Sequence, residues 1–427
     1  MSLDERLRAL RARAERPDVE RALAEVRRAA RRARRARRLG AAGLAAAVVA
    51  AVVFVPRLFS LRDDPGGFIT PAPLPTESGF RRCAKSPGDS RLIAYFHKGD
   101  LWLYDVTADE VRQLTDDGKQ EFQWGPQFLN DSCVVYVSAD STALEVASLD
   151  GSRTQVILRA RARILGFDIS PDGSTIVYVN SVGSAHRLEE ISLSRATPTV
   201  LRTLDPIGEG GAGSEGEVSV SWSPDGSRLL VTDTHTVGAD GKDATESIHL
   251  LDAQGRDTRP PWSGTHARWS PNGRTIYYRG YAGTSGIAWH SLDVASGERT
   301  NLGMRPGANN LVVSPDGNRV AYDTSYFGET PREALLSGSP PDVYVYDFRS
   351  GVETLLKRGA LGPVWVSSSE LLVTDARAPD PQKSLNSWEP TGTVGKYTLA
   401  GRRTEVAITS TLWDPAVLLE PPPDPGR

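Results

Sequence analysis

The sequence predicts an all-β protein, a seven-bladed β-propeller, preceded by an N-terminal transmembrane α-helix. Three observations predict this fold. An arginine-rich segment stands directly before a long uncharged run, a strand-turn-strand pattern recurs about every 47 residues, and 39% hydrophobic residues are combined with 40 Gly and 29 Pro. This composition is typical of a folded, turn-rich chain. Six blades with one irregular unit is the alternative.

The order of these features predicts five segments. They are an Arg-rich cytoplasmic tail (1–38), a transmembrane helix that acts as a signal anchor (39–59), a Pro/Gly-rich linker (60–80), an extracytoplasmic β-propeller (81–410) and a Pro-rich C-terminal tail (411–427).

The predicted anchor is built on residues 39–56, LGAAGLAAAVVAAVVFVP, which carry no charge. At ~1.5 Å per residue, a helix of this run crosses most of the ~30 Å hydrocarbon core, and extension to residue 59 completes the crossing. A buried globular helix and a cleaved signal peptide are the alternatives. The flanking arginines argue against the first, and the absence of an A-x-A-like site soon after the run argues against the second.

The orientation of the anchor follows from Arg27–Arg38, RRAARRARRARR, which holds eight arginines in twelve residues. Positive charge beside a span stays on the cytoplasmic side, so we expect the N-terminus inside the cell and the propeller outside. The same cluster could bind nucleic acid, but its place against a span favours anionic lipid as its partner.

Charge is distributed unevenly along the chain. Residues 1–38 hold 14 Arg and six acidic residues, which leaves 36 basic and 47 acidic residues for the rest. Because phosphate binding needs a basic surface, the acidic main body argues against nucleic acid as its ligand.

The propeller prediction is based on a repeat in which a short apolar strand runs into Ser-Pro-Asp-Gly or a close variant and a second strand follows at once. Four copies are nearly identical in form: 167–179, 220–233, 267–279 and 311–323. More divergent copies occupy 85–96, 123–137 and 363–375. A third and a fourth strand follow most copies, although the partner of the third strand at 247–253 is weak. Four strands per unit of this length indicate a propeller blade.

Turn chemistry accounts for the Pro-Asp-Gly residues. Proline fixes φ at the first turn position, aspartate accepts a local backbone hydrogen bond, and glycine adopts the left-handed conformation. We therefore expect Asp172, Asp225 and Asp316 to be structural and not catalytic.

This strand-SPDG-strand signature resembles the WD40-like repeats of TolB-like β-propellers, over roughly residues 86–408. The resemblance implies the fold but no particular activity, because blades of this kind serve as scaffolds, peptidase lids and lyases. TolB-like translocation proteins have six blades, a separate α/β domain and no anchor. The seven units and the apolar run seen in this sequence depart from that pattern, so translocation partners are not carried over.

The two cysteines, Cys83 and Cys133, both lie outside the membrane in the predicted topology. An even number of cysteines in an oxidising compartment favours a disulfide bond. They fall in neighbouring blades, and we predict that they pair; two buried free thiols are the alternative.

Long connections between strands predict a ligand-binding face. Antiparallel strands alternate ends, so the loops between second and third strands lie on the same face as the crossovers between blades. Such loops on a rigid scaffold are a common binding arrangement, although tolerated loop growth would look the same. They span 205–217, 234–246, 325–341 and 376–391. The candidate ligand residues on this face are Asp233, His235, Arg279, Tyr281, Tyr326, Phe327, Asp375 and Trp388.

No motif for chemistry stands out. The sequence lacks a G-x-S-x-G elbow, an H-E-x-x-H motif and a Walker loop, and its six histidines show no ligand spacing. We therefore predict no catalytic residue, no metal site and no cofactor. The leading hypothesis is a binding scaffold or sensor with an extracytoplasmic protein or glycan partner. The alternatives are an extracytoplasmic lyase or hydrolase acting on carbohydrate or peptide, and signalling through residues 1–38.

Overall fold

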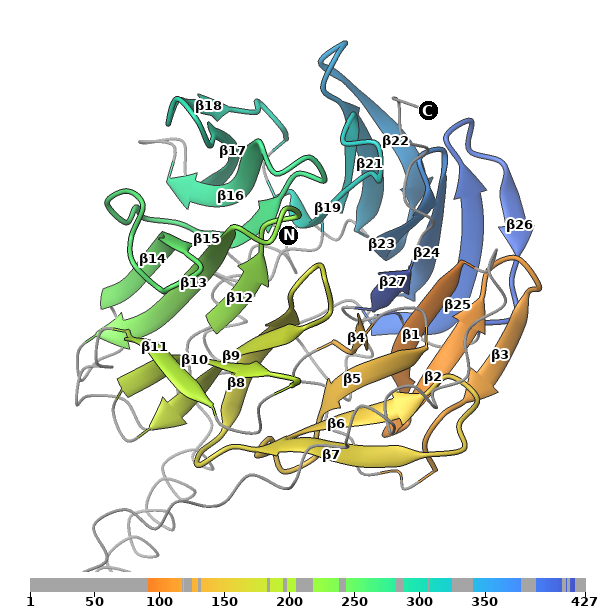
Figure 1. Cartoon of the computed structure of the whole chain (residues 1–427). Helices are drawn as coiled ribbons and strands as arrows, with labels where there is room; N and C mark the ends of the chain where they lie inside the picture. Colours follow the sequence, from red (N-terminus) through yellow and green to blue (C-terminus); the bar gives the residue numbers. More distant parts are fainter. Residues whose placement is uncertain are drawn as a thin grey trace, which may run out of the picture. The chain divides into compact units, whose positions relative to one another are not determined.

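The computed structural model describes residues 91–116, 118, 125–129, 132–182, 185–194, 198–204, 218–237, 243–281, 287–305, 307–324, 341–377, 389–408, 412 and 415–418. These residues form seven antiparallel sheets, and within these ranges there is no helix. Figure 1 shows the sheets arranged around a central axis, so the fold is a seven-bladed β-propeller. The seven-bladed prediction is confirmed, and the six-bladed alternative is wrong.

The strands of each blade follow one another from the innermost strand outward. Blades 1 to 3 contain β27 (Ala416–Leu418), β1 (Leu92–His97), β2 (Asp100–Asp105) and β3 (Glu110–Gln113); β4 (Gln127–Leu129), β5 (Cys133–Val137), β6 (Ala143–Ser148) and β7 (Thr154–Arg159); β8 (Ile164–Ile169), β9 (Thr175–Val182), β10 (Ala185–Ser192) and β11 (Thr199–Thr203). Blades 4 and 5 contain β12 (Val218–Trp222), β13 (Arg228–Val237) and β14 (Asp243–Asp252); β15 (Thr265–Trp269), β16 (Thr275–Tyr281), β17 (Ile287–Asp293) and β18 (Arg299–Asn301). Blades 6 and 7 contain β19 (Asn309–Val313), β20 (Arg319–Asp323), β21 (Asp342–Asp347) and β22 (Val352–Arg358); β23 (Ala360–Ser367), β24 (Glu370–Arg377), β25 (Glu389–Thr398) and β26 (Arg403–Glu405).

Blade 4 differs from the others because its sheet has three strands. The segment after β14 contributes only two isolated bridges in place of a fourth strand, Leu251 with Asp257 and Ile248 with Trp262. This agrees with the sequence, in which the partner expected after the third strand of this unit is weak.

The ring closes through strands from opposite ends of the chain. β27 pairs antiparallel with β1, so that Val417 lies opposite Ile93 and Leu418 opposite Leu92. Blade 1 therefore takes its innermost strand from the C-terminal end and its other strands from the N-terminal end (Figure 1). The predicted tail at 411–427 needs correction, because residues 416–418 belong to the propeller.

The Ser-Pro-Asp-Gly turns have the chemistry expected of them. Asp225 Oδ1 accepts hydrogen bonds from the hydroxyl of Ser223 at 2.6 Å and the backbone N–H of Ser227 at 3.0 Å, and Gly226 has φ +70°. These bonds stabilise the carboxylate and lower the pKa of Asp225 to about 2. The same bonds recur around Asp172 and Asp316.

Hydrophobic residues fill the spaces between neighbouring blades. One cluster joins β5 and β6 of blade 2 to β8 and β9 of blade 3, with Ile157, Ile164 and Ile176 inaccessible to solvent. Because the sheets pack face to face, both faces of the inner strands are apolar, and polar side chains collect at strand ends and on exposed outermost strands such as β3 and β26.

The predicted anchor, tail and linker cannot be placed. Residues 1–38, 39–59 and 60–80 lie outside the described ranges. Among the residues that the structure does describe, no helix is long and apolar enough to cross a bilayer.

Candidate functional site

The two faces of the propeller are defined by strand direction. The Ser-Pro-Asp-Gly turns join first and second strands on one face, which we call the turn face. Second strands end and first strands begin on the opposite face, which we call the mouth face. The four long segments predicted to carry the ligand join strand ends on the mouth face. Most of their residues, 205–217, 238–242, 325–340 and 378–388, lie outside the described ranges.

Three predicted ligand residues occupy equivalent positions at the mouth face. Asp233, Arg279 and Asp375 lie on the second strands of blades 4, 5 and 7, each opposite the first residue of the innermost strand. His235 and Tyr281 lie two residues further along the strands that carry Asp233 and Arg279. Tyr326, Phe327 and Trp388 lie outside the described residues.

Asp233 joins blade 4 to blade 3. Its Oδ1 lies 3.3 Å from Nδ1 of His186 on β10, and both side chains are only 2% exposed. A carboxylate and an imidazole at this depth lose their hydration, so the contact between them offsets part of that loss. Asp233 therefore acts across the seam between two blades.

Arg279 and Asp323 make similar bonds across the next seams. Arg279 on β16 donates to Oδ1 of Asn309 on β19 at 3.3 Å, which joins blades 5 and 6. Asp323, inaccessible to solvent, accepts from the backbone N–H of Gly362 on β23 at 2.8 Å, which joins blades 6 and 7. It also accepts from Asn310 at 2.9 Å.

Asp375 lies between two cations. Nζ of Lys357 on β22 of blade 6 is 3.7 Å from Oδ1, and Nη2 of Arg403 on β26 is 3.6 Å from Oδ2. Its side chain is 24% exposed. The structure thus places Asp233, Arg279 and Asp375 in polar contacts near the mouth face that cross three seams, between blades 3 and 4, 5 and 6, and 6 and 7. We call the bonds made by Asp233, Arg279, Asp323 and Asp375 the seam ring.

Some members of the seam ring were not singled out from the sequence. His186, Asn309 and Asp323 belong to it, and Asp323 had a visible signal, because it holds the same position in its repeat as Asp233 and Asp375. No local pattern marked His186, which lies 47 residues before its partner.

A further carboxylate, that of Asp168, joins the innermost strands of neighbouring blades. Asp168 on innermost strand β8 accepts from the backbone N–H of Trp222 on β12 at 2.6 Å and from that of Ile169 at 2.9 Å. Gln127 on β4 donates to the side chain of Asp168 and, at 3.4 Å, to the carbonyl of Phe167. Asp168 therefore links the innermost strands of blades 2, 3 and 4.

Burial raises the pKa of Asp168 to about 7, although its hydrogen bonds oppose the shift. The unfolded pKa is ~3.9, so the stability contributed by the neutral acid is present at low pH and is lost as the pH rises toward 7. We expect the free energy of unfolding to fall by about 2 kcal/mol between pH 5 and pH 7 through this group. Urea unfolding of the full chain in mild detergent at both pH values measures this change.

Asp168→Asn should remove that part of the pH dependence. It should also lower stability at every pH, because an amide nitrogen cannot accept a backbone N–H. Asp225→Asn is the matched control, since the pKa of Asp225 is already far below this window. An Asp168→Asn variant that keeps the full pH dependence of the wild type would contradict the assignment.

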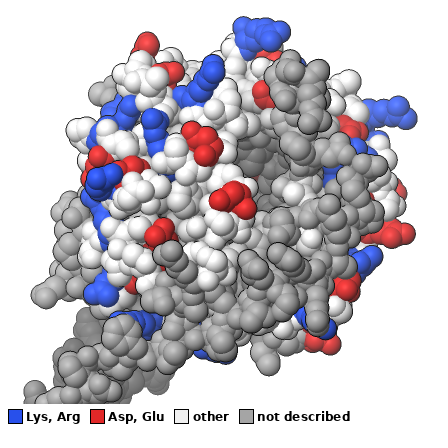
Figure 2. Space-filling model, in the orientation of Figure 1, with Lys and Arg blue, Asp and Glu red and all other residues white. Residues whose placement is uncertain are grey.

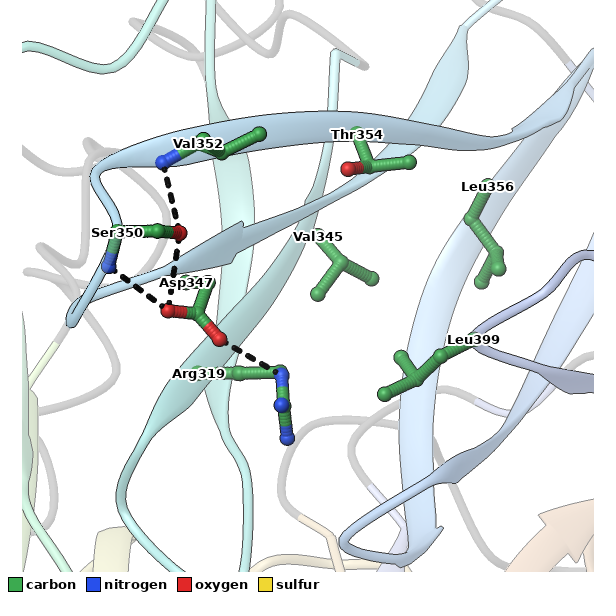
Figure 3. A pocket seen from close by; sticks show the side chains of 8 residues that line it. All are labelled: Arg319, Val345, Asp347, Ser350, Val352, Thr354, Leu356 and Leu399. Carbon is green, nitrogen blue, oxygen red and sulfur yellow. Dashed lines mark hydrogen bonds and ion pairs between the residues drawn. The ribbon is translucent and has the colours of Figure 1, made fainter.

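Figure 3 shows a small pocket of about 170 Å³ on blade 6, bordered by Leu399 of blade 7. Its polar residues satisfy one another: Nε of Arg319 lies 3.1 Å from Asp347, which also accepts from the N–H of Ser350 at 3.0 Å. Val345 and Leu356 supply its apolar wall. The arrangement is that of a structural network.

Figure 2 shows the charges of the described residues on one face. Their acidic side chains stand as separate spots near a central hollow, and most of their Lys and Arg lie nearer the outline. Within the described ranges, no group of three or more His, Cys, Asp or Glu is placed to hold a metal ion.

Cys133, at the start of β5, forms a disulfide bond. The other cysteine of the sequence, Cys83, lies outside the described residues, so the pairing of the two stays a prediction.

Comparison with solved structures places this fold among known propellers. TolB from Acinetobacter baumannii is 19% identical, with 77% of this chain and 82% of that chain covered and a TM-score of 0.42. An oligogalacturonate lyase from Vibrio parahaemolyticus is 16% identical over 69% of this chain and 85% of its own, with a TM-score of 0.52. The chain shares its fold with propeller proteins.

The tricorn protease is 12% identical, with a TM-score of 0.53, over 78% of this chain but only 34% of its own. The chain thus spans about a third of that protein. At these identities the likeness concerns the fold alone. No protein-family model and no curated protein sequence matches the chain.

Proposed function

We propose that this chain is a single-pass membrane protein whose propeller lies outside the cytoplasm and binds a protein or glycan partner through its mouth face. One observation carries the proposal. The polar side chains at the mouth-face strand ends bond across the seams between blades, as Asp233 does with His186 and Asp323 with Gly362. The strands from which the long segments depart are therefore tied to neighbouring blades, and long segments on a rigid scaffold are a common binding arrangement.

The membrane part of the proposal is supported by the sequence. The uncharged run at 39–56 and the arginines of 27–38 favour one span with the N-terminus inside and the cluster against anionic lipid. Ligand binding outside could then be reported through residues 1–38. Protease treatment of intact spheroplasts tests the topology: a C-terminal tag should be digested and an N-terminal tag protected. Protection of both tags would overturn it.

The enzyme alternative needs carboxylates or histidines that are free to meet a substrate at the channel. The carboxylates of Asp233 and Asp323, which are buried, and of Asp168, which is partly buried, are instead each engaged by a group of a neighbouring blade. Their geometry supports a structural role and favours the binding scaffold.

Replacement of the mouth-face segments tests the binding proposal. Residues 238–242, 326–339 and 379–387 would be exchanged, one at a time, for Gly-Ser linkers of equal length in the full chain. Because the bonds across the seams remain, the unfolding midpoint should change little. At least one exchange should abolish the adducts that a membrane-permeant amine cross-linker forms with the wild-type chain in cells.

If an exchange lowers the unfolding midpoint and also abolishes the adducts, the exchanged segment folds as part of the core. That result would count against a separate binding role for the segment. Unchanged adducts in all three exchanges would overturn the proposal. Exchange of residues 255–258, which follow β14 on the turn face, is the control and should leave the adducts intact.

A further inference from the structure

A second binding site is indicated on the turn face, at the seam between blades 3 and 4. A groove of about 660 Å³ lies there, within the range of pockets that hold small ligands or peptide side chains. It runs from the Ser-Pro-Asp-Gly turns of both blades to outer strand β11. The residues that line it are Ser170, Pro171, Asp172, Ser174, Thr175, Glu190, Thr199, Val200, Leu201, Trp222, Asp225, Gly226, Ala253 and Gln254.

The charge of this groove has one sign. Asp172, Asp225 and Glu190 line it, and the lining includes no Lys, Arg or His. Local hydrogen bonds in the two turns lower the pKa values of Asp172 and Asp225, so both are ionised at neutral pH. Positive charge is the complement of such a lining.

Glu190 differs from the two turn aspartates. It lies on β10 and is partly buried, and its carboxyl group makes no hydrogen bond or ion pair with any residue in the described part of the chain. Burial raises the pKa of this carboxyl group. A bound cation would offset the loss of hydration that the carboxylate undergoes.

Trp222 adds an aromatic wall to the groove. Its side chain lines the groove and is 9% exposed. Its indole N–H is buried without a hydrogen bond, as are those of Trp102 and Trp262 elsewhere in the described part of the chain. The contact that Trp222 offers to a ligand is therefore its ring.

The remaining wall is apolar. Leu201 and Ala253 line the groove, and Val200 on outer strand β11 is 52% exposed, one of the few large hydrophobic residues on the described surface. The aliphatic stem of lysine or arginine packs well on such a wall while its charged end reaches a carboxylate.

We propose that the groove between blades 3 and 4 binds a polypeptide segment through one Lys or Arg side chain. The charged end pairs with Glu190, the stem packs on Val200 and Leu201, and the ring of Trp222 contacts the segment. This site lies on the face opposite the proposed mouth-face site, and it does not depend on the function proposed there.

The test uses the full-length protein in mild detergent and an array of nine-residue peptides with Lys or Arg at the centre and varied flanks. Matched peptides carry uncharged norleucine in place of Lys and citrulline in place of Arg. We expect a subset of the charged peptides to bind at least tenfold more tightly than their matched peptides. Equal binding of charged and uncharged peptides would overturn the proposal, as would binding of free spermidine with no peptide bound.

Variants then assign the contacts for the tightest peptide. Glu190→Gln should weaken binding about tenfold, Trp222→Phe about threefold, and Val200→Lys should abolish it by placing a cation in the groove. Val200 is exposed, so that variant keeps the fold even if another does not. Glu145→Gln, on the corresponding strand of blade 2, is the control and should bind as the wild type does. If both Glu190→Gln and Val200→Lys bind the peptide as tightly as the wild type does, the proposed site is wrong.

Discussion

Truncation of the chain after residue 414 is expected to lower the free energy of unfolding by at least about 3 kcal/mol. The truncation removes β27, the strand with which the C-terminal end closes blade 1. Val417 packs against the cluster that contains Ile93, and Leu418 packs against the cluster that contains Leu92. Loss of two partly buried aliphatic side chains costs ~1 to 2 kcal/mol each, and exposed edge hydrogen bonds add to this.

Urea unfolding of the full chain in mild detergent, followed by circular dichroism, measures the effect. The matched control ends after residue 418, which removes 419–427 and leaves β27 in place, and should unfold at the wild-type midpoint. If both truncations have the same midpoint, closure by β27 does not stabilise the ring and the pairing assigned to blade 1 is wrong.

Asp233→Ala is expected to destabilise the propeller by about 3 kcal/mol, because it leaves His186 buried without its partner. The chain offers a matched comparison. His249 and Asp257 have the same Nδ1 to Oδ1 separation of 3.3 Å, but the side chain of Asp257 is 30% exposed, compared with 2% for Asp233. The Asp257 carboxylate keeps part of its hydration, and it also accepts from Nη1 of Arg202 at 2.6 Å. Its pair with His249 should therefore contribute less, and Asp257→Ala should cost about 1 kcal/mol less than Asp233→Ala.

A double-mutant cycle with His186→Ala separates the pair from the rest of the seam. The coupling energy between Asp233 and His186 should exceed that between Asp257 and His249 by about 1 kcal/mol or more. Equal costs for the two aspartates would show that burial does not set the strength of these contacts, and would undermine the rigid mouth face on which the binding proposal depends.

Local chemistry made most of the fold predictable. The Pro-Asp-Gly turns repeat at a nearly constant spacing, and each turn is stabilised by residues within five positions, as around Asp225. A pattern of this kind can be read without knowledge of the fold. The weak fourth strand of blade 4 was predictable for a related reason. The segment after its third strand lacks alternating apolar residues, so no regular strand is indicated there.

The closure of the ring could not be predicted from such patterns. β27 is three residues long, lies among prolines, and pairs with a strand more than 300 positions earlier. Strands this short have no measurable periodicity. The C-terminal segment was therefore interpreted as a tail.

The sequence predicted where the candidate residues lie better than it predicted what they contact. Asp233, Arg279 and Asp375 were selected as polar residues next to long connections, and the structure places them at the mouth face. Their bonds across blade seams depend on which strands become neighbours, as His186 and Asp233 show. The raised pKa of Asp168 likewise results from packing and has no sequence signal.

Site-specific photo-cross-linking in living cells tests the central claim, binding through the mouth face, most directly. A photoreactive amino acid would replace Asp240, Glu329 or Gln382 in the mouth-face segments, and Arg274 or Asn318 in turns of blades 5 and 6 on the turn face. The account predicts one discrete partner, identified by mass spectrometry, from at least two mouth-face positions and none from Arg274 or Asn318. The same adducts from both faces, or from the turn positions alone, would contradict it.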